Sequence, residues 1–194
     1  MTESDRDPAD RSIGKISSHR VYTGRVVSLD VDRVRFPNGT EGELEMIRHS
    51  GASAVVPLLQ MPDGEMKVIL IRQYRYAAEG YVYEIPAGRL DEGETPEACA
   101  HRELKEETGY TAGAMTRLTT IFTTPGFTDE QIHLFMATDL VSGKSELEAD
   151  EVLDLYPVPL SEALEMIRSG VIRDGKTISA ILFATRFTEA SKPA

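Results

Sequence analysis

The segment 88–110 constrains the fold of this chain more than any other part of the sequence. It reads GRLDEGETPEACAHRELKEETGY, with Thr95 and Pro96 near its middle and Gly109 near its end. Thr is favoured as an N-cap, Pro suits the first helical position, and Gly suits the left-handed residue that follows a helix. The segment therefore predicts a helix over about 96–108 with a loop on each side.

Three carboxylates share one side of this predicted helix. At about 100° per residue, Glu103 and Glu107 lie one turn apart and Glu106 sits beside them. Like charges so placed repel each other by about 0.2–0.5 kcal/mol per pair. Arg102 and Lys105 each point away from part of the cluster, so a dominant cation partner within the chain is not obvious from the sequence. A hard divalent cation that takes carboxylate oxygens resolves the repulsion; the alternative is a solvated acidic helix face.

The charge of the whole chain limits its partners. The formal net charge of −11 argues against non-specific binding to nucleic acid or to anionic membranes. We therefore expect no nucleic-acid and no membrane partner. If the substrate is itself a polyanion, a bound metal or a local arginine cluster has to attract it.

The spacing within the segment decides between a metal site and a solvated face. From Gly88 to Gly109 it follows the pattern G-x5-E-x7-R-E-L-x-E-E-x-G, which resembles the Nudix box at every defined position. Tyr110 departs from the family, which more often has an aliphatic residue there. The resemblance implies a loop–helix–loop packed on a mixed sheet, and hydrolysis of a diphosphate with Mg²⁺, or with Mn²⁺ as the alternative ion.

The resemblance also assigns roles to residues of the box. It implies four metal ligands, which are Glu103, Glu106, Glu107 and the backbone carbonyl of Ala87. Glu106 is either an additional ligand or bound through water.

Other residues of the box are expected to support these ligands. Arg102 is expected to orient a glutamate by a charge-assisted hydrogen bond, and Glu94 to hold the loop. Leu104 is expected to anchor the helix to the core. Cys99 lies among alanines in the middle of the predicted helix, which favours a packing role over a nucleophilic one.

The catalytic base is expected outside the box. Glu151 follows an acidic, glycine-containing loop and resembles the late glutamate that the family supplies from a mobile segment. Glu106 is the second candidate for this role. An ordinary acidic loop before a strand is the alternative explanation of Glu151.

Features outside the box narrow the substrate. Pro125 lies sixteen residues after Gly109, as does the proline of the loop typical of ADP-ribose pyrophosphatases; a simple Pro-Gly turn is the alternative. Arg72 and Arg75 flank a Gln-Tyr pair that resembles the family's substrate-binding stretch, unless they belong to a surface strand of alternating charge. Glu130 matches a position that contacts the distal ribose.

The layout from Val21 to about Phe187 resembles the ADP-ribose pyrophosphatase group. This implies cleavage of ADP-ribose to AMP and ribose 5-phosphate, with GDP-mannose or another nucleotide sugar as the rival substrate. A non-hydrolytic isomerase is a weaker alternative because Cys99 lies in the wrong place for a catalytic cysteine. A ligand-sensing regulator is also weaker, because the box is intact and no basic helix-turn-helix segment follows it.

The expected fold is α+β: a Nudix α/β/α sandwich with a mixed sheet, plus a small N-terminal antiparallel sheet. Residues 1–15 are polar and are expected to lack fixed structure. Residues 16–50 form an N-terminal strand segment, which the resemblance implies is exchanged between the subunits of a homodimer. Residues 51–194 form the Nudix hydrolase domain.

Sequence patterns place the elements along the chain. Strands are predicted over 21–29, 31–36, 43–49, 54–59, 66–71, 73–83, 115–123, 130–137 and 152–158, and helices over 161–169 and 176–188. Ser161 is the expected cap of the helix over 161–169. The charged start of the chain is no secretory signal, and its one cysteine excludes an internal disulfide, so a cytoplasmic location is expected.

Overall fold

Two separate sheets organise the residues that the computed structural model describes, which are 13–145 and 153–188. The chain divides into two compact units. One is Met1–His49 with Thr124–Glu130, and the other is Ser50–Thr123 with Gln131–Ala194. Most of the segment expected to lack structure, residues 1–12, lies outside the described residues, and so does Glu151.

The first unit contains a three-stranded antiparallel sheet. Its strands, in the order β1-β2-β3, are Gly14–Thr23, Ser28–Arg35 and Glu41–Arg48. The loop Thr124–Glu130 belongs to the same unit, where the backbone N–H of Ile47 donates to the carbonyl of Phe127 over 2.8 Å.

The strand predicted over 21–29 is wrong, because a turn interrupts it. β1 ends at Thr23, and the N–H of Gly24 donates to the carbonyl of Val27 over 2.9 Å to close a turn before β2. The sequence signal failed because β1 is exposed along nearly its whole length. A strand without a buried face needs no alternation of apolar residues.

Ion pairs occupy the buried positions of this small sheet. Asp30 and Asp32 on β2 are only 6% and 5% exposed. Arg48 donates to both carboxylates, and its Nη1 also reaches Asp129 over 3.1 Å, which ties the loop Thr124–Glu130 to β3. The hydrogen bond from Arg20 lowers the pKa of Asp30 to about 2, so this carboxylate is ionised at neutral pH.

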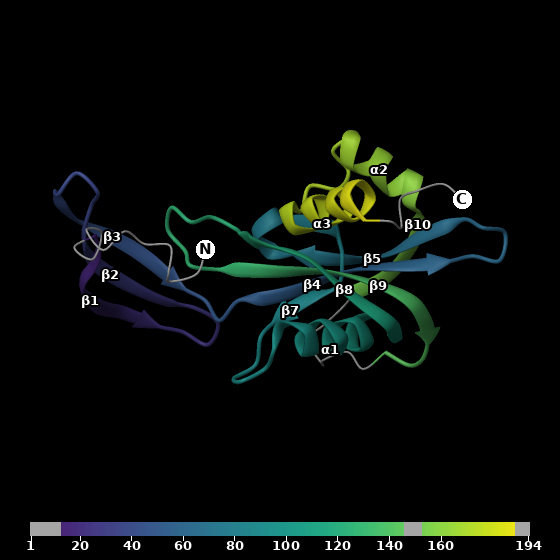
Figure 1. Ribbon diagram of the computed structural model, residues 1–194, viewed down its shortest axis with the longest axis horizontal. Helices are drawn as coiled ribbons and strands as arrows, with labels where there is room; N and C mark the ends of the chain where they lie inside the picture. The colour runs from purple at the N-terminus through teal and green to yellow at the C-terminus, as the bar shows by residue number, and fades with distance from the viewer. Residues whose placement is uncertain (1–12, 146–152, 189–194) are drawn as a thin grey trace. The chain divides into compact units, whose positions relative to one another are not determined.

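The second unit is a seven-stranded mixed sheet with helices (Figure 1). The strand order is β10-β5-β4-β9-β8, with β6 added to β5 and β7 to β4. β4 and β9 run parallel, and the other neighbours are antiparallel. The elements are β4 (Ala52–Gln60), β5 (Met66–Arg75), a 3₁₀ turn (Tyr76–Ala78), β6 (Gly80–Glu84), β7 (Ala87–Arg89), α1 (Pro96–Thr108), β8 (Tyr110–Phe122), β9 (Gln131–Ser142), β10 (Leu153–Pro159), α2 (Leu160–Arg168) and α3 (Gly175–Phe187). The expected α+β class is confirmed.

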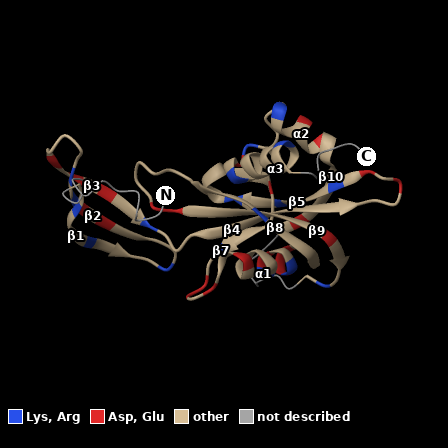
Figure 2. Cartoon of the chain, viewed as in Figure 1, with Lys and Arg blue, Asp and Glu red and all other residues tan. Residues whose placement is uncertain are grey.

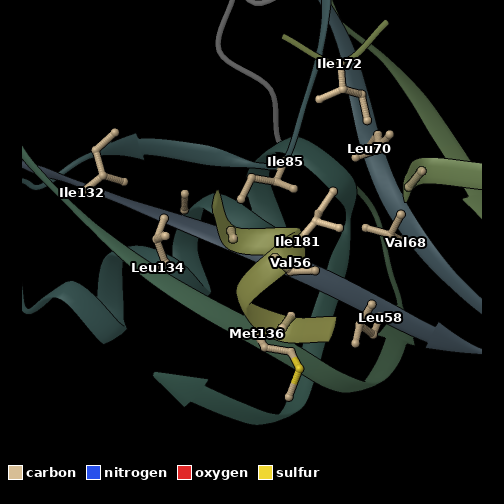
Figure 3. Close-up of a cluster of buried hydrophobic side chains, with 14 of the residues drawn as sticks. Val56, Leu58, Val68, Leu70, Ile85, Ile132, Leu134, Met136, Ile172 and Ile181 are labelled. Carbon is tan, nitrogen blue, oxygen red and sulfur yellow. The ribbon is translucent and has the colours of Figure 1, made fainter. Parts of the chain in front are cut away.

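Helices cover both faces of this sheet, α1 on one and α2 with α3 on the other (Figure 1). Side chains alternate between the faces along a strand, and β4 is buried on both. Val55 packs in one cluster with Leu104 of α1, whereas Val56 packs in the other with Ile181 of α3 (Figure 3). The central strands therefore form two cores, and one of them fixes α1 against the sheet.

Helix α1 begins and ends where its capping residues predict. The Thr95 hydroxyl accepts from the N–H of Ala98 over 3.3 Å, and Pro96 is the first helical residue. Gly109 has φ +74°, and its N–H donates to the carbonyl of Lys105 over 2.8 Å. The predicted helix over 96–108 is confirmed, as is the burial of Leu104, which is 0% exposed.

The two C-terminal helices begin earlier than predicted. Ser161 lies inside α2, whose N-cap position is Pro159 and has no side-chain cap, so the expected cap at Ser161 is wrong. Helix α3 begins at Gly175 because the Asp174 carboxylate accepts from the N–H of Thr177 over 2.9 Å. Among residues 13–145 and 153–188, no helix has the length and apolar character needed to cross a membrane.

We expect Leu104→Ala to lower the free energy of unfolding by about 2–5 kcal/mol, because the change leaves a cavity between α1 and the sheet. Urea denaturation measures this loss. Leu182→Ala on α3, where the side chain is 44% exposed, is the control and should cost much less. Similar losses in both variants would contradict the packing assigned to Leu104.

Candidate active site

The acidic side of α1 meets strand β7 at its first two residues, Ala87 and Gly88. The Glu107 carboxylate accepts from the backbone N–H of Ala87 over 2.9 Å. The Glu103 carboxylate lies directly against Gly88, so close that a Cβ at residue 88 would stand 1.8 Å from Glu103 Oε1. Both glutamates are buried, at 7% and 3% exposed for Glu103 and Glu107. Two carboxylates from successive helical turns therefore converge on the neighbouring residues Ala87 and Gly88.

The guanidinium of Arg102 lies among three carboxylates, one of which is Glu103. Its Nη1 donates to Glu103 over 2.6 Å and to Glu106 over 3.0 Å, while Nε and Nη2 each donate to Glu94 over 2.9 Å. Arg102 is therefore a cation partner of the cluster that residue spacing alone did not make obvious. The loop before α1 folds back onto the helix and brings Glu94 to the same guanidinium; in Figure 2 acidic residues colour this loop and α1.

Arg102 fixes the ionisation of its partners. Its hydrogen bonds lower the pKa of Glu94 to about 2, against the opposing effect of burial. The carboxylates of Glu94, Glu103 and Glu106 in turn raise the pKa of Arg102. The pair Arg102–Glu94 thus stays charged at neutral pH and joins the loop before α1 to the helix.

The Glu94–Arg102 pair predicts a dependence of stability on acid. The pKa of Glu94 in the folded protein lies below its ordinary value of 4.5. Its contribution to the free energy of unfolding is therefore fully present above pH 4.5 and is lost as the pH falls through about 2. We expect Glu94→Gln to be less stable than the wild type at pH 7, and the difference to shrink between pH 4.5 and 2. Denaturant unfolding at several pH values measures this, and a difference that stays constant with pH would contradict it.

The donor set at β7 and α1 fits a hard divalent metal. Glu103 and Glu107 bring carboxylate oxygens to Gly88 and Ala87, and the backbone carbonyl of Ala87 is a further oxygen donor; oxygen donors are what Mg²⁺ prefers. Within the described part of the chain, however, no group of three or more His, Cys, Asp or Glu side chains is already arranged to hold a metal ion. The reason is local: Glu103 and Glu106 are both turned to Arg102.

Arg72 and Arg75, both expected to bind substrate, lie on opposite faces of β5. They are three residues apart, and alternate residues of a strand point to opposite sides. Arg72 stacks on Tyr81, with its guanidinium carbon 3.9 Å from the ring centre, and lies 3.7 Å from Asp154. Arg75 instead pairs with Glu84, and the charge of Glu107 also raises its pKa. Arg75 is therefore the arginine that is held by Glu84, three residues before Ala87 in the chain.

Glu84 and Lys176 are polar residues of this region that sequence analysis missed. Glu84 ends β6 and is 4% exposed, and it accepts from Lys176 Nζ of α3 over 2.8 Å. The only sequence signal was Glu84 in an otherwise apolar segment just before the box. Its partner lies 92 residues further on, where no local pattern connects the two.

Two other candidate residues belong to the first unit. Pro125 is exposed in the loop Thr124–Glu130. Glu130 lies at the end of this loop, where its carboxylate is 3.5 Å from His49 Nδ1 and its N–H donates to the Thr128 hydroxyl over 3.2 Å. The third candidate outside the box, Glu151, lies outside the described residues.

The thiol of Cys99 is inert in this structure. It is 0% exposed, and its Sγ lies 3.5 Å and 3.4 Å from the carbonyls of Gly88 and Arg89. Burial raises the pKa of Cys99 to about 11, so the thiol is protonated at neutral pH. These contacts show the packing role that was predicted.

Comparison with known proteins adds to this geometry. Residues 49–180 match the family model described as "NUDIX domain". An ADP-ribose pyrophosphatase of Bacillus subtilis is 41% identical over 170 residues, which cover 87% of this chain and 90% of that protein. A GDP-mannose pyrophosphatase of Salmonella typhimurium is 36% identical over 179 residues, covering 84% of this chain and 88% of that protein. A solved structure titled "Crystal structure of ADP compounds hydrolase" shares the fold, with a TM-score of 0.78 at 24% identity, over 93% of this chain and 96% of that one.

Proposed function

We propose that this chain, which belongs to the NUDIX domain family, hydrolyses the diphosphate linkage of ADP-ribose. The products would be AMP and ribose 5-phosphate. The observation that carries this proposal is the convergence of Glu103 and Glu107 on the neighbouring residues Ala87 and Gly88 within a complete box. The similarity to an ADP-ribose pyrophosphatase over most of both chains supports the choice of substrate.

Nudix hydrolases generally use divalent metals, and for this chain we propose Mg²⁺, with Mn²⁺ as the alternative. Glu103, Glu107 and the carbonyl of Ala87 would hold it, with Glu106 as a further ligand. When bound, the metal neutralises the diphosphate and activates water for attack at phosphorus.

The remaining roles belong to side chains of the protein. Arg102 holds Glu94 and so keeps the loop before α1 in place. Arg75 is assigned to the diphosphate, because a guanidinium binds phosphate oxygens in pairs and this one is held by Glu84, three residues before Ala87 in the chain. Pro125 and Glu130 are assigned to the substrate-binding loop, with Glu130 at the distal ribose.

A carboxylate completes the reaction as general base. We assign this role to Glu151 and keep Glu106 as the second candidate. The base takes a proton from the attacking water, and the bond between the bridging oxygen and the attacked phosphorus breaks. Arg102 acts through its hydrogen bond to Glu106, which it holds on the same side of α1 as Glu103.

The proposal includes a homodimer in which the segment 16–50 is exchanged between subunits. Two facts support it. Both hydrophobic clusters of the described residues consist of side chains from the second unit, so the small sheet has no comparable core of its own. Strand β1 also exposes Ile16, Val21 and Tyr22, at 44%, 54% and 59%. We further propose a cytoplasmic location, which the single, buried and reduced cysteine supports.

The rival substrate is GDP-mannose, because a GDP-mannose pyrophosphatase is also similar along most of its length. Comparison of kcat/KM for ADP-ribose, GDP-mannose, NADH, diadenosine polyphosphates and nucleoside triphosphates with Mg²⁺ present tests the choice. We expect ADP-ribose to have the highest value. A higher value for GDP-mannose would move the assignment to that sugar nucleotide, and no turnover of any compound would reject the hydrolase proposal.

A further inference from the structure

An ion-pair network lies at the end of β6, beside the residues assigned to catalysis. At its centre is Glu84, whose carboxylate is almost fully buried. Arg75 donates to it twice, from Nε to Oε1 over 3.0 Å and from Nη2 to Oε2 over 2.8 Å. Lys176 Nζ donates to the same Oε2 over 2.8 Å. One buried anion therefore holds two cations that come from β5 and α3.

The start of α3 is fixed to β6 at the same place. Lys176 Nζ also lies 3.0 Å from Asp174, the N-cap of α3. The hydroxyl of Thr177, which is fully buried, donates to Asp174 over 2.6 Å and accepts from the N–H of Ile85 over 2.9 Å. The backbone that follows Glu84 is thus tied to the first turn of α3.

Electrostatics keeps Glu84 charged in its buried position. Burial disfavours the ionised form, but the hydrogen bonds from Arg75 and Lys176 outweigh it and lower the pKa of Glu84. Buried ion pairs are weak sources of stability, because desolvation cancels most of their attraction. An apolar side chain at residue 84 would fill the same space equally well. The ion pairs of Glu84 are therefore better explained by the positioning of Arg75 than by packing.

The pairing with Glu84 leaves one edge of Arg75 available. A guanidinium has five N–H groups in a rigid plane, and Glu84 takes one from Nε and one from Nη2. Nη1 donates no hydrogen bond to another described residue, and the Arg75 side chain is 43% exposed. The edge formed by Nη1 and the second N–H of Nη2 points away from Glu84 and can bind two oxygens of one phosphate.

We propose that Glu84 is a positioning residue for substrate binding: it fixes the plane of Arg75, so that the free edge of the guanidinium binds the diphosphate of the nucleotide substrate. Lys176 holds the carboxylate of Glu84 in turn. This inference rests on the proposed function, because it needs a diphosphate as ligand.

A double-mutant cycle tests the proposal. The proteins are the wild type, Glu84→Gln, Arg75→Ala and the double variant, and the measured quantities are KM and kcat for ADP-ribose. In the Glu84→Gln variant, an NH₂ group replaces one of the two carboxylate oxygens and faces a donor group of Arg75 or Lys176. Arg75 therefore loses its fixed plane. We expect KM to rise about tenfold or more, the equivalent of one charge-assisted hydrogen bond, with a smaller change in kcat. In the Arg75→Ala background the same change should have no further effect on KM.

Two controls separate positioning from folding. Glu165→Gln removes an exposed bidentate ion pair, which Glu165 forms with Arg168 on α2. This variant should leave KM unchanged. Arg75→Lys keeps an ion pair with Glu84 but lacks the second edge, so its KM should rise close to that of Arg75→Ala. This variant keeps the proposal testable if Glu84→Gln does not fold, and a wild-type KM in Arg75→Lys would overturn it.

The outcomes distinguish this inference from the proposed function. An equal rise of KM on changing Glu84 in the presence and the absence of Arg75 would show that Glu84 does not act through Arg75, and would overturn the inference. A wild type that turns over no nucleotide sugar would overturn the proposed function instead. Calorimetric binding of ADP to the same four proteins then gives the same cycle without turnover, and additive losses of affinity there would reject the inference.

Discussion

Glu107→Gln is expected to lower kcat for ADP-ribose by about 10²–10³-fold or more, the loss typical of removing one electrostatic group from an active site. The amide oxygen of Gln can still accept from the N–H of Ala87, a contact of 2.9 Å in the wild type, so the peptide before Gly88 should keep its place. What the variant loses is the negative charge that a divalent metal requires. Steady-state kinetics and the metal dependence of the rate measure the effect.

The control for this variant is Glu97→Gln, which removes an exposed carboxylate from the first turn of the same helix. It should leave kcat and the metal dependence unchanged. Both variants should unfold at nearly the wild-type temperature. Full activity of Glu107→Gln at ordinary Mg²⁺ concentrations would reject Glu107 as a metal ligand.

Gly88→Ala is expected to lower kcat/KM by about 10²-fold, although it adds only one methyl group. The new Cβ would lie 1.8 Å from Oε1 and 2.1 Å from Cδ of Glu103, so the carboxylate has to leave its position. The colliding group is the end of a flexible side chain, which can rotate away, so the fold should persist. The expected signature is therefore a large loss of activity and metal affinity with little change in melting temperature.

Gly175→Ala is the matched control, because a Cβ at residue 175 meets no atom within 4 Å. It lies in the first turn of α3, where Ala is a better helix former than Gly. Its activity should equal that of the wild type. Normal activity of Gly88→Ala would show that the position of Glu103 against β7 is not needed for the reaction.

The parts of this molecule that the sequence predicted correctly depend on local signals. Helix α1 was predicted to the residue because Thr95, Pro96 and Gly109 each act on the backbone within one turn. The same reasoning placed Glu103 and Glu107 on one side of the helix, since the helical repeat alone determines it. Strand β1 was not found, because an exposed strand lacks the apolar alternation by which strands are recognised.

The contacts that the sequence could not predict connect distant segments. Glu94 reaches Arg102 only because the loop between them folds back, and Glu84 meets Lys176 only through the packing of α3 against β6. The opposite orientation of Arg72 and Arg75 follows from strand alternation, but only once β5 is known to continue to Arg75 rather than to end at Ile71. Residue spacing indicates which side chains share a face, whereas these contacts depend on the fold as a whole.

The products formed from ADP-ribose test the central claim most directly. With Mg²⁺ present, the wild type should release AMP and ribose 5-phosphate in equal amounts, and a chelator should stop the reaction reversibly. The Glu107→Gln variant should form neither product at a comparable rate. Absence of both products from the wild type at saturating metal, or release of other products such as free adenine, would contradict the account.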